Sequence, residues 1–523
     1  MNKKRFFQNA FMLIVSTFLL RLVFTAFRVV VSNKVGAECM GLYQLTFAIY
    51  NVSVTFATSG INFAVTRLIA KALSKNDRAG AKKVMRLSIA YSLAFGLAAF
   101  LIVFALSEKI GIYLLCDERS VLSLKAFALS LPFISVSSAV SGYFYAARNV
   151  PTTLISRVLE QAAQIAFFYI FMQFVPDGNI ELSCCVIVAA SAVSEVLGSV
   201  YLIAKFVLEY RGQPSGREKG VFKKLCAVAL PSAAGAYLKS GLQTVENVLI
   251  PIGFRKFGAS QSDALKGYGI LCSMVMPVIF FPSFVFASFS MLLIPEFTEA
   301  QTLKKNDEIK RTAGLAIRLT LMFSLFISAN FIVFGQSIGN ALYTEKDAGA
   351  LIKMMAPLIP FMYLDSIADG MLKGLGEYNR VLKYSSIDTV VSITMIYFVV
   401  SKHGLYGYIV VIYTSTMLNA FLSIRRLLVV SKNRLEFFSD IVVPFCASLF
   451  SALCSKLLLM PLSYSGGKVF FVVTALLGSA ALLTAFILIS RGKMYETVKY
   501  AVRTVFALKP KSNFNLACRI NNN

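Results

Sequence analysis

Apolar runs close to 20 residues long recur along this chain, from about residue 9 to about residue 490. A helix of that length spans a bilayer core of about 30 Å. Hydrophobic residues make up 57% of the chain and charged residues 15%, whereas soluble domains carry about 25% charged residues. The strands of a membrane β-barrel would alternate in polarity over about 10 residues, and these runs do not. The sequence therefore predicts an all-α polytopic membrane protein.

About fourteen of these runs are expected to be transmembrane helices. They lie at roughly 9–31, 41–64, 87–107, 121–144, 157–176, 182–204, 225–250, 267–293, 313–340, 351–372, 384–401, 404–424, 438–460 and 468–490. If the N-terminal Lys3, Lys4 and Arg5 face the cytoplasm, about 37 of the 52 basic residues fall on that side. An even number of spans returns the basic C-terminal tail to the same side. We therefore expect a multi-pass protein with both termini in the cytoplasm.

The formal net charge of +26 is explained by this topology and by contact with anionic membrane lipids. Nucleic acid is a poor second candidate, because the basic residues concentrate in the connections between apolar runs. The nine cysteines contain no CxxC pair, and the single histidine, His403, lacks a second one to complete a metal site. The sequence also has neither a nucleophile elbow nor a phosphate-binding glycine loop. We expect no catalytic residue, no metal ligand and no cofactor.

Three sequence patterns occur twice, about 230 residues apart. Lys-Asn-Asp stands at 75–77 and again at 305–307. "GYFYAARNVPTTLISRVLEQ" (142–161) is matched by "GMLKGLGEYNRVLKYSSIDT" (370–389), and "KVGAECMGLYQL" (34–45) by "KFGASQSDALKGYGIL" (256–271). The repeat predicts two pseudo-symmetric six-helix bundles with a substrate cavity between them near mid-membrane. In both copies of the first pattern the aspartate, Asp77 or Asp307, is expected to cap the following helix.

The repeat also predicts how the chain is divided. The predicted parts are an N-terminal lobe (1–210), a cytoplasmic linker (211–224), a C-terminal lobe (225–430), an extra helix pair (431–490) and a basic cytoplasmic tail (491–523). Each lobe would hold six spans, so both would begin in the cytoplasm and share one orientation. Such parallel repeats are known in transporters.

The duplicated layout and the 142–161 segment resemble the multidrug/oligosaccharidyl-lipid/polysaccharide (MOP) exporter superfamily. Within it they are most similar to the polysaccharide-biosynthesis branch, which includes stage V sporulation protein B and the lipid II flippases. The residues that carry the resemblance are Gly142, Pro151, Thr152, Ser156, Glu160 and Gln161. The resemblance implies a MATE-like fold and a monomer in the bacterial plasma membrane. It also implies that an undecaprenyl-pyrophosphate-linked sugar is moved across that membrane.

Ionised side chains inside spans are functional candidates, because each costs about 2.5–3.5 kcal/mol on insertion scales. Arg21 and Arg28 lie seven residues apart on the first span, and so on one face; Lys239 and Glu246 have the same spacing on the seventh. A guanidinium binds a phosphate through two hydrogen bonds. We therefore expect Arg21, Arg28 and Lys239 to meet the pyrophosphate, and Glu246 to pair with Lys239 or Arg28 in the empty site. The alternative is a set of structural ion pairs between helices.

Four further residues are candidates for binding or coupling. Asp365 and Asp369 lie four residues apart on one helix face, which suits coupling to a proton or Na⁺; the alternative is an ion pair with Lys373. Glu160 opens the fifth span, where it either contacts substrate or favours the positive helix end. Arg67 at the inner end of the second span either meets an anionic head group or fixes topology.

The leading functional hypothesis is a lipid-linked oligosaccharide flippase, driven by protons, Na⁺ or the membrane potential. A cation-coupled multidrug exporter of MATE type is the alternative, but Arg21 and Arg28 would repel cationic drugs. A membrane glycosyltransferase would need acidic or histidine-bearing outer loops, and the outer loops here are short. The sequence does not decide which glycan or lipid carrier is moved.

Overall fold

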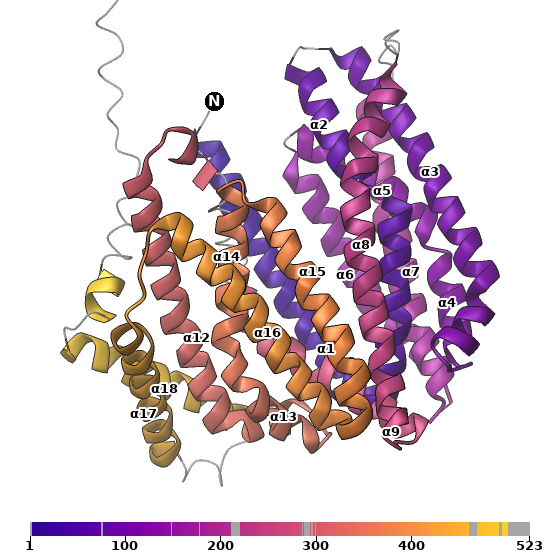
Figure 1. The fold of residues 1–523 in the computed structure, drawn as a ribbon. Coiled ribbons are helices and arrows are strands. Elements are labelled where there is room, and N and C mark those ends of the chain that lie inside the picture. The colour runs from indigo at the N-terminus through magenta and orange to yellow at the C-terminus, as the bar shows by residue number, and fades with distance from the viewer. Residues whose placement is uncertain are drawn as a thin grey trace, which may run out of the picture. The chain divides into compact units, whose positions relative to one another are not determined.

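The computed structural model describes residues 3–499, apart from 75–76, 148, 177, 211–219, 285, 287–292, 294–296, 299, 460–467 and 491–493. All regular structure in this part of the chain is helical (Figure 1). By their internal contacts the residues form two compact units. The first holds Met1–Phe284, Tyr343–Ala348 and Ser385–Ser415, and the second holds Val285–Leu342, Gly349–Tyr384 and Thr416–Asn523.

The helices up to residue 284 all belong to the first unit. They are α1 (Lys3–Thr58), α2 (Ile61–Ser74), α3 (Arg78–Lys109), α4 (Ser120–Ala128), α5 (Leu131–Ala146), α6 (Val150–Met172), α7 (Ile180–Tyr210), α8 (Val221–Lys256), α9 (Gln261–Gly269) and α10 (Met276–Phe280). Short π or 3-10 turns extend three of them: η1 (Ile110–Leu114), η2 (Ile270–Val275) and η3 (Phe281–Ser283).

The later helices are shared between the units. They are α12 (Asn306–Leu342), α13 (Asp347–Met355), α14 (Ile359–Gly374), α15 (Tyr378–Met395), α16 (Ser401–Ser431), α17 (Val443–Leu459) and α18 (Lys468–Ser490). The turns η4 (Ala356–Leu358), η5 (Ile396–Val400) and η6 (Phe438–Val442) join or precede them. The C-terminal parts of α15 and the N-terminal part of α16 belong to the first unit, and α12, α14, α17 and α18 to the second.

The number of membrane crossings agrees with the sequence once two long segments are divided. Eleven helical segments of the described chain are long and apolar enough to cross a membrane, and the bent pair α4–α5 adds a twelfth. Two of the eleven, Leu19–Leu73 and Tyr378–Ser431, are 55 and 54 residues long, whereas one crossing needs about 20. Each is broken at a glycine with positive φ, Gly36 or Gly404, where two helices meet at a kink. Counting each as two crossings raises twelve to the predicted fourteen, and the all-α membrane fold is confirmed.

The compact units do not follow the predicted repeat boundaries. In the first unit α8 and α9 pack against α1, although the repeat assigns α8 and α9 to the C-terminal lobe. In the second unit α17 and α18 pack against each other and against α12. The division into lobes 1–210 and 225–430 therefore remains a prediction about the repeat.

The two repeated aspartates differ in their local structure. Asp77 precedes α3, and its side chain accepts a hydrogen bond from the backbone N–H of Gly80 at 2.7 Å, as expected of an N-cap. Lys75 and Asn76 lie outside the described residues. The same prediction for Asp307 is wrong, because α12 begins at Asn306 and places Asp307 in its first turn. There its charge still favours the positive end of the helix.

Candidate functional site

Arg28 lies on the first limb of α1, before the break at Gly36. Its Nε and Nη2 atoms are buried and have no hydrogen-bond partner among the described residues. Its charge is within electrostatic reach of Tyr43 on the second limb of α1, of Cys272 in η2 and of Tyr343. An unpartnered buried donor costs about 1–3 kcal/mol, and more when it is charged. The site around Arg28 therefore has cationic donors available for an anionic ligand.

Arg21 lies two turns before Arg28 on the same limb. Its guanidinium carbon stands 4.0 Å from the centre of the Phe284 ring, a cation–π contact that leaves the nitrogens at the edge free to donate. Arg21 is exposed, whereas Arg28 is partly buried. The first limb of α1 thus presents one accessible and one desolvated guanidinium.

On α8, the predicted pairing of Glu246 is not present in this structure. Glu246 accepts a hydrogen bond from Ser392 of α15 at 2.5 Å, and no ion pair in the described chain joins it to Lys239 or Arg28. Lys239 is exposed. The Glu246 carboxylate interacts electrostatically with the carboxylate of Asp388 on α15. Asp388 in turn accepts a hydrogen bond from Ser415 of α16 at 2.5 Å.

Glu246, Asp388, Ser392 and Ser415 together form an acidic cluster in the first unit. It brings two carboxylates and two hydroxyls from three helices within interaction distance. Oxygen ligands of this kind suit a hard cation, and a carboxylate pair also suits a shared proton. Asp388 lies inside the predicted span 384–401, but only the fold shows that it lies near Glu246.

The predicted coupling pair Asp365 and Asp369 lies on α14 in the second unit. Asp365 Oδ2 accepts a hydrogen bond from the side-chain amide of Asn419 at 2.8 Å. Asp369 stands 3.6 Å from the ammonium of Lys373, which is the ion pair that the sequence offered as the alternative. Arg67 lies exposed on α2 in the first unit. For Asp365, Asp369 and Arg67 a role in transport stays a prediction.

Two acidic residues, Glu160 and Glu195, take part in contacts that α7 makes with α6 and α1. Glu160 on α6 accepts a hydrogen bond from Ser156 at 3.0 Å, and the same hydroxyl lies 3.1 Å from the carbonyl oxygen of Gly198 on α7. Glu195 on α7 accepts a hydrogen bond from the Tyr50 hydroxyl at 2.5 Å. These contacts join α6 and α1 to α7, so both carboxylates take part in holding the helices together.

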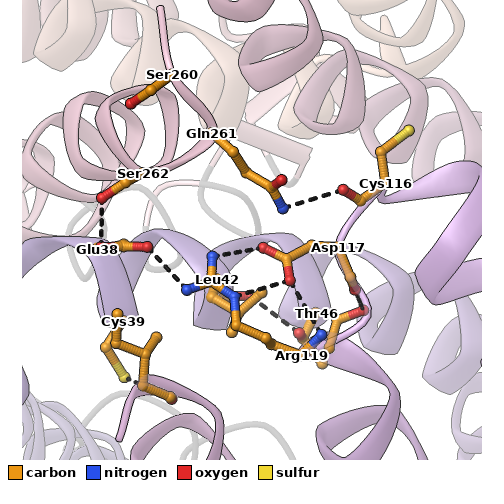
Figure 2. Close-up of polar contacts among 12 residues, drawn as sticks. Glu38, Cys39, Leu42, Thr46, Cys116, Asp117, Arg119, Ser260, Gln261 and Ser262 are labelled. Atoms are coloured by element: carbon orange, nitrogen blue, oxygen red, sulfur yellow. Dashed lines mark hydrogen bonds and ion pairs between the residues drawn. The ribbon is translucent and has the colours of Figure 1, made fainter. Parts of the chain in front are cut away.

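Sequence reasoning missed an ion-pair network just after the Gly36 break in α1 (Figure 2). Arg119 lies 2.9 Å from Glu38 and 2.8 Å from Asp117. The Ser262 hydroxyl, on α9, donates to the second oxygen of Glu38 at 2.6 Å. The side-chain amide of Gln261 donates to the carbonyl of Cys116 at 3.2 Å. The network joins α1, the α3–α4 connection and the start of α9, and its one sequence signal was that Glu38 and Ser262 lie in matching repeat segments.

The charges of this network are strongly stabilised. Burial would raise the pKa of Asp117, but hydrogen bonds from Arg119 and Gln261 outweigh it and lower that pKa below its ordinary value. The hydrogen bond to Asp117 raises the pKa of Arg119. Both groups therefore stay ionised throughout the physiological pH range.

The same repeat segments also pack directly against each other. A Cβ added to Gly41 of α1 would lie 2.0 Å from the carbonyl oxygen of Leu265, and one added to Gly269 would lie 2.0 Å from that of Ala37. Only glycine permits such an approach of two backbones. Gln44 donates a hydrogen bond to the carbonyl of Cys272 at 3.3 Å across this contact. The contact and the ion-pair network together hold α1 on α9.

A family model described as polysaccharide biosynthesis protein matches residues 6–301, more than half of the 523 residues. The chain belongs to this family. Stage V sporulation protein B of Bacillus subtilis (strain 168) is 24% identical over 413 residues, which cover 77% of this chain and 80% of that protein. The lipid II flippase MurJ of the same organism is 23% identical over 425 residues, 74% of this chain and 75% of that protein.

Solved structures show which fold this family member has. The inward closed conformation of a lipid II flippase MurJ matches with a TM-score of 0.66 at 14% identity, over 91% of this chain and 98% of that one. An inward-facing multidrug MATE transporter of the MOP superfamily matches with a TM-score of 0.64 at 16% identity, over 79% and 96%. The family model confirms the predicted resemblance to the polysaccharide-biosynthesis branch, and these structures confirm the predicted MATE-like, all-helical fold.

Residues of the segment 142–161, which carries the family resemblance, make contacts between helices. A Cβ on Gly142 would lie 2.8 Å from the carbonyl oxygen of Asn62 on α2, so Gly142 lets α5 approach α2. Ser156 links Glu160 to α7. The Nε2 atom of Gln161 is buried without a hydrogen-bond partner. Gly142 and Ser156 therefore serve helix packing, whereas Gln161 has a buried donor that no described residue accepts from.

Proposed function

We propose that this protein is a flippase that moves an undecaprenyl-pyrophosphate-linked sugar across the bacterial plasma membrane by alternating access. The observation that carries the proposal is the partly buried guanidinium of Arg28, two of whose nitrogens are buried without a hydrogen-bond partner in the described part of the chain. The membership in a polysaccharide-biosynthesis family and the likeness to stage V sporulation protein B and to a lipid II flippase support it. The translocation itself needs no organic cofactor.

The chemistry of the substrate explains why a desolvated arginine is suitable. A pyrophosphate carries its charge on several oxygens, and a guanidinium offers parallel N–H donors in a geometry that matches them. In a low-dielectric site these hydrogen bonds are stronger than in water. Arg28 would bind the pyrophosphate directly. The accessible Arg21 and Lys239 would meet its outer oxygens, and Arg67 would attract it from the cytoplasmic side.

The energy source is proposed to act through acidic groups inside the membrane. The acidic cluster of Glu246 and Asp388 would accept a proton or Na⁺ when the cycle turns, because two neighbouring carboxylates favour one shared positive charge. The original candidates Asp365 and Asp369 compete with this assignment, although Asp369 already has Lys373 as a partner. We further propose that a single chain with both termini in the cytoplasm is sufficient.

The deciding experiment is transport by the full chain in reconstituted vesicles. A labelled lipid-linked pyrophosphate sugar is placed in one leaflet, and its arrival in the other is measured by an impermeant enzyme or quencher. Wild type should flip it, and Arg21→Ala/Arg28→Ala should not. A Lys205→Gln/Lys383→Gln variant, which removes two exposed charges elsewhere, serves as the control. Unchanged transport by the arginine variant would reject the pyrophosphate assignment.

A multidrug exporter of MATE type is tested in the same vesicles. In the vesicles, cationic drugs replace the lipid and their transport is measured. In a separate assay, drug susceptibility is compared between expressing and non-expressing cells. Transport of drugs without transport of the lipid would replace the flippase proposal. The unpartnered arginine argues against that outcome, because a cationic site repels cationic drugs.

A further inference from the structure

A second cationic site lies far along the chain from Arg28, in the second unit. A cavity of about 500 Å³ opens between the start of α12, the connection after α16 and the helical residues 494–499. Ligand sites commonly have volumes of about 300–1,000 Å³. By the topology predicted from the basic residues, all three of these segments face the cytoplasm. Figure 1 shows α12 beside α17 and α18, the helices that the other two segments adjoin.

Three cationic side chains from one helix line this cavity. Lys310 and Arg318 lie eight residues apart on α12, with Gly314 between them, so they share one face. Arg311 lines the same cavity. The backbone of this helix is held by Asn433, whose side-chain amide donates to the carbonyl oxygen of Lys310 at 2.8 Å. The cationic side chains therefore project from a fixed helical surface.

The acidic residues at the cavity balance part of this positive charge. Glu496 stands 3.5 Å from Lys499, and the buried Asp440 stands 3.6 Å from Arg318. Asp307 remains beside Lys310 and Arg311. The cavity can thus hold a phosphate against the cations, and Asp307 and Glu496 can accept hydrogen bonds from donors on the same ligand.

The side chains beside the cavity indicate that this ligand comes from the membrane. Phe437 and Phe438, four and five residues after Asn433, are 70% and 71% exposed. They stand at the start of the span that runs through α17. Large apolar side chains with that exposure suit acyl chains better than water, so the cations lie where a membrane meets the cytoplasm. Basic pockets at this depth bind lipid head groups.

We propose that the cavity lined by Lys310, Arg311 and Arg318 binds the phosphodiester head group of a membrane phospholipid. Its phosphate contacts the three cations, and an N–H or O–H group on its other end donates to Asp307 or Glu496. Phosphatidylethanolamine and phosphatidylglycerol have such donors, whereas phosphatidylcholine has none. The bound lipid bridges α12 to the connections that lead into and out of the α17–α18 pair. This site is separate from the transported substrate.

Native mass spectrometry of the purified full chain tests the proposal. Short-chain phosphatidylethanolamine, phosphatidylglycerol and phosphatidylcholine are titrated separately, and a dissociation constant is measured for each. The first two should bind about tenfold more tightly than phosphatidylcholine. Lys310→Gln/Arg311→Gln should weaken their binding by about tenfold to thirtyfold, since each surface cation contributes to head-group attraction. The charge-matched control Lys205→Gln/Lys383→Gln should bind like wild type.

Three results would overturn the proposal. One is equal binding by the Lys310/Arg311 variant and by the control. A second is equal affinity for phosphatidylcholine and phosphatidylethanolamine. A third is displacement of the lipid by inorganic phosphate at equal concentration, which would make the ligand a soluble anion. The charge-conserving variant Lys310→Arg/Arg311→Lys guards against misfolding, because it must elute and bind like wild type.

Discussion

The two sides of the Gly36 break in α1 differ in how their charges are neutralised. Beyond the break at Gly36, Glu38 is bound by Arg119 and Ser262, and Arg119 is bound by two carboxylates. Before the break, Arg28 has two buried nitrogens without a partner among the residues that the structure describes. Both sites pay a desolvation cost, but only the first recovers it from within the protein. A charge that the fold leaves unmatched is therefore the better candidate for binding a ligand.

The largest expected effect is a loss of stability when Arg119 is replaced. Arg119→Met removes the partner of Asp117, whose side chain is 3% exposed, and leaves that carboxylate buried without a counter-charge. We expect a loss of about 3 kcal/mol in the free energy of unfolding. The measurement is the midpoint of thermal unfolding in detergent. Arg157→Met, on an exposed face of α6, is the control, and an equal midpoint for both variants would contradict a structural role for the network.

The second effect is on transport, at Arg28. Arg28→Met should lower the initial rate of lipid flipping by about 10- to 100-fold, because hydrogen bonds to a charged group contribute about 1.5–3 kcal/mol. Its thermal midpoint should stay at or above that of wild type, because an unpartnered buried charge is removed. Arg28→Lys keeps the charge without the paired donors and should fall between the two. If Arg28→Met lost much of its stability but kept full transport, Arg28 would be a structural residue and not a substrate ligand.

The sequence predicted the membrane fold because hydrophobic run length depends on local composition alone. It also predicted separate spans at 9–31 and 41–64 and at 384–401 and 404–424, and the helices are broken at Gly36 and Gly404, in or next to those intervals. The expectation for Asp77 was right, whereas that for Asp307 was wrong by a shift of the helix start. A difference of one or two residues at a helix end is beyond what spacing can determine.

From the sequence, only the residue types of the candidate site could be predicted, and not the contacts between those residues. Ionised residues inside spans can be found by inspection, but a partner can lie far away in the sequence, as Ser392 lies 146 residues from Glu246. The Glu38 network was missed because its members lie near span ends, where charges are common and carry little information. Helix packing decides which of these charges meet, and no local pattern records it.

The third prediction concerns the backbone contact that accompanies the network. Gly41→Ala would place a Cβ 2.0 Å from the carbonyl oxygen of Leu265, so α1 and α9 must separate. Overpacking of this kind costs about 1–3 kcal/mol, which should lower the thermal midpoint less than Arg119→Met does. Gly235→Ala is the matched control, since nothing lies within 4 Å of a Cβ there. Equal midpoints for the two variants would show that the helices adjust freely.

The smallest expected effect is the pH dependence of the stability that the ion-pair network provides. Its direction follows from the pKa of Asp117. Because the folded pKa of Asp117 lies below the ordinary value, the carboxylate stabilises the fold above about pH 4 and loses that contribution as pH falls through the folded pKa. The raised pKa of Arg119 adds no change near neutrality. The difference in thermal midpoint between wild type and Asp117→Asn should therefore be constant from about pH 5 to pH 8 and shrink below about pH 4. A difference that changes between pH 6 and pH 8 would mean that another group titrates in the network.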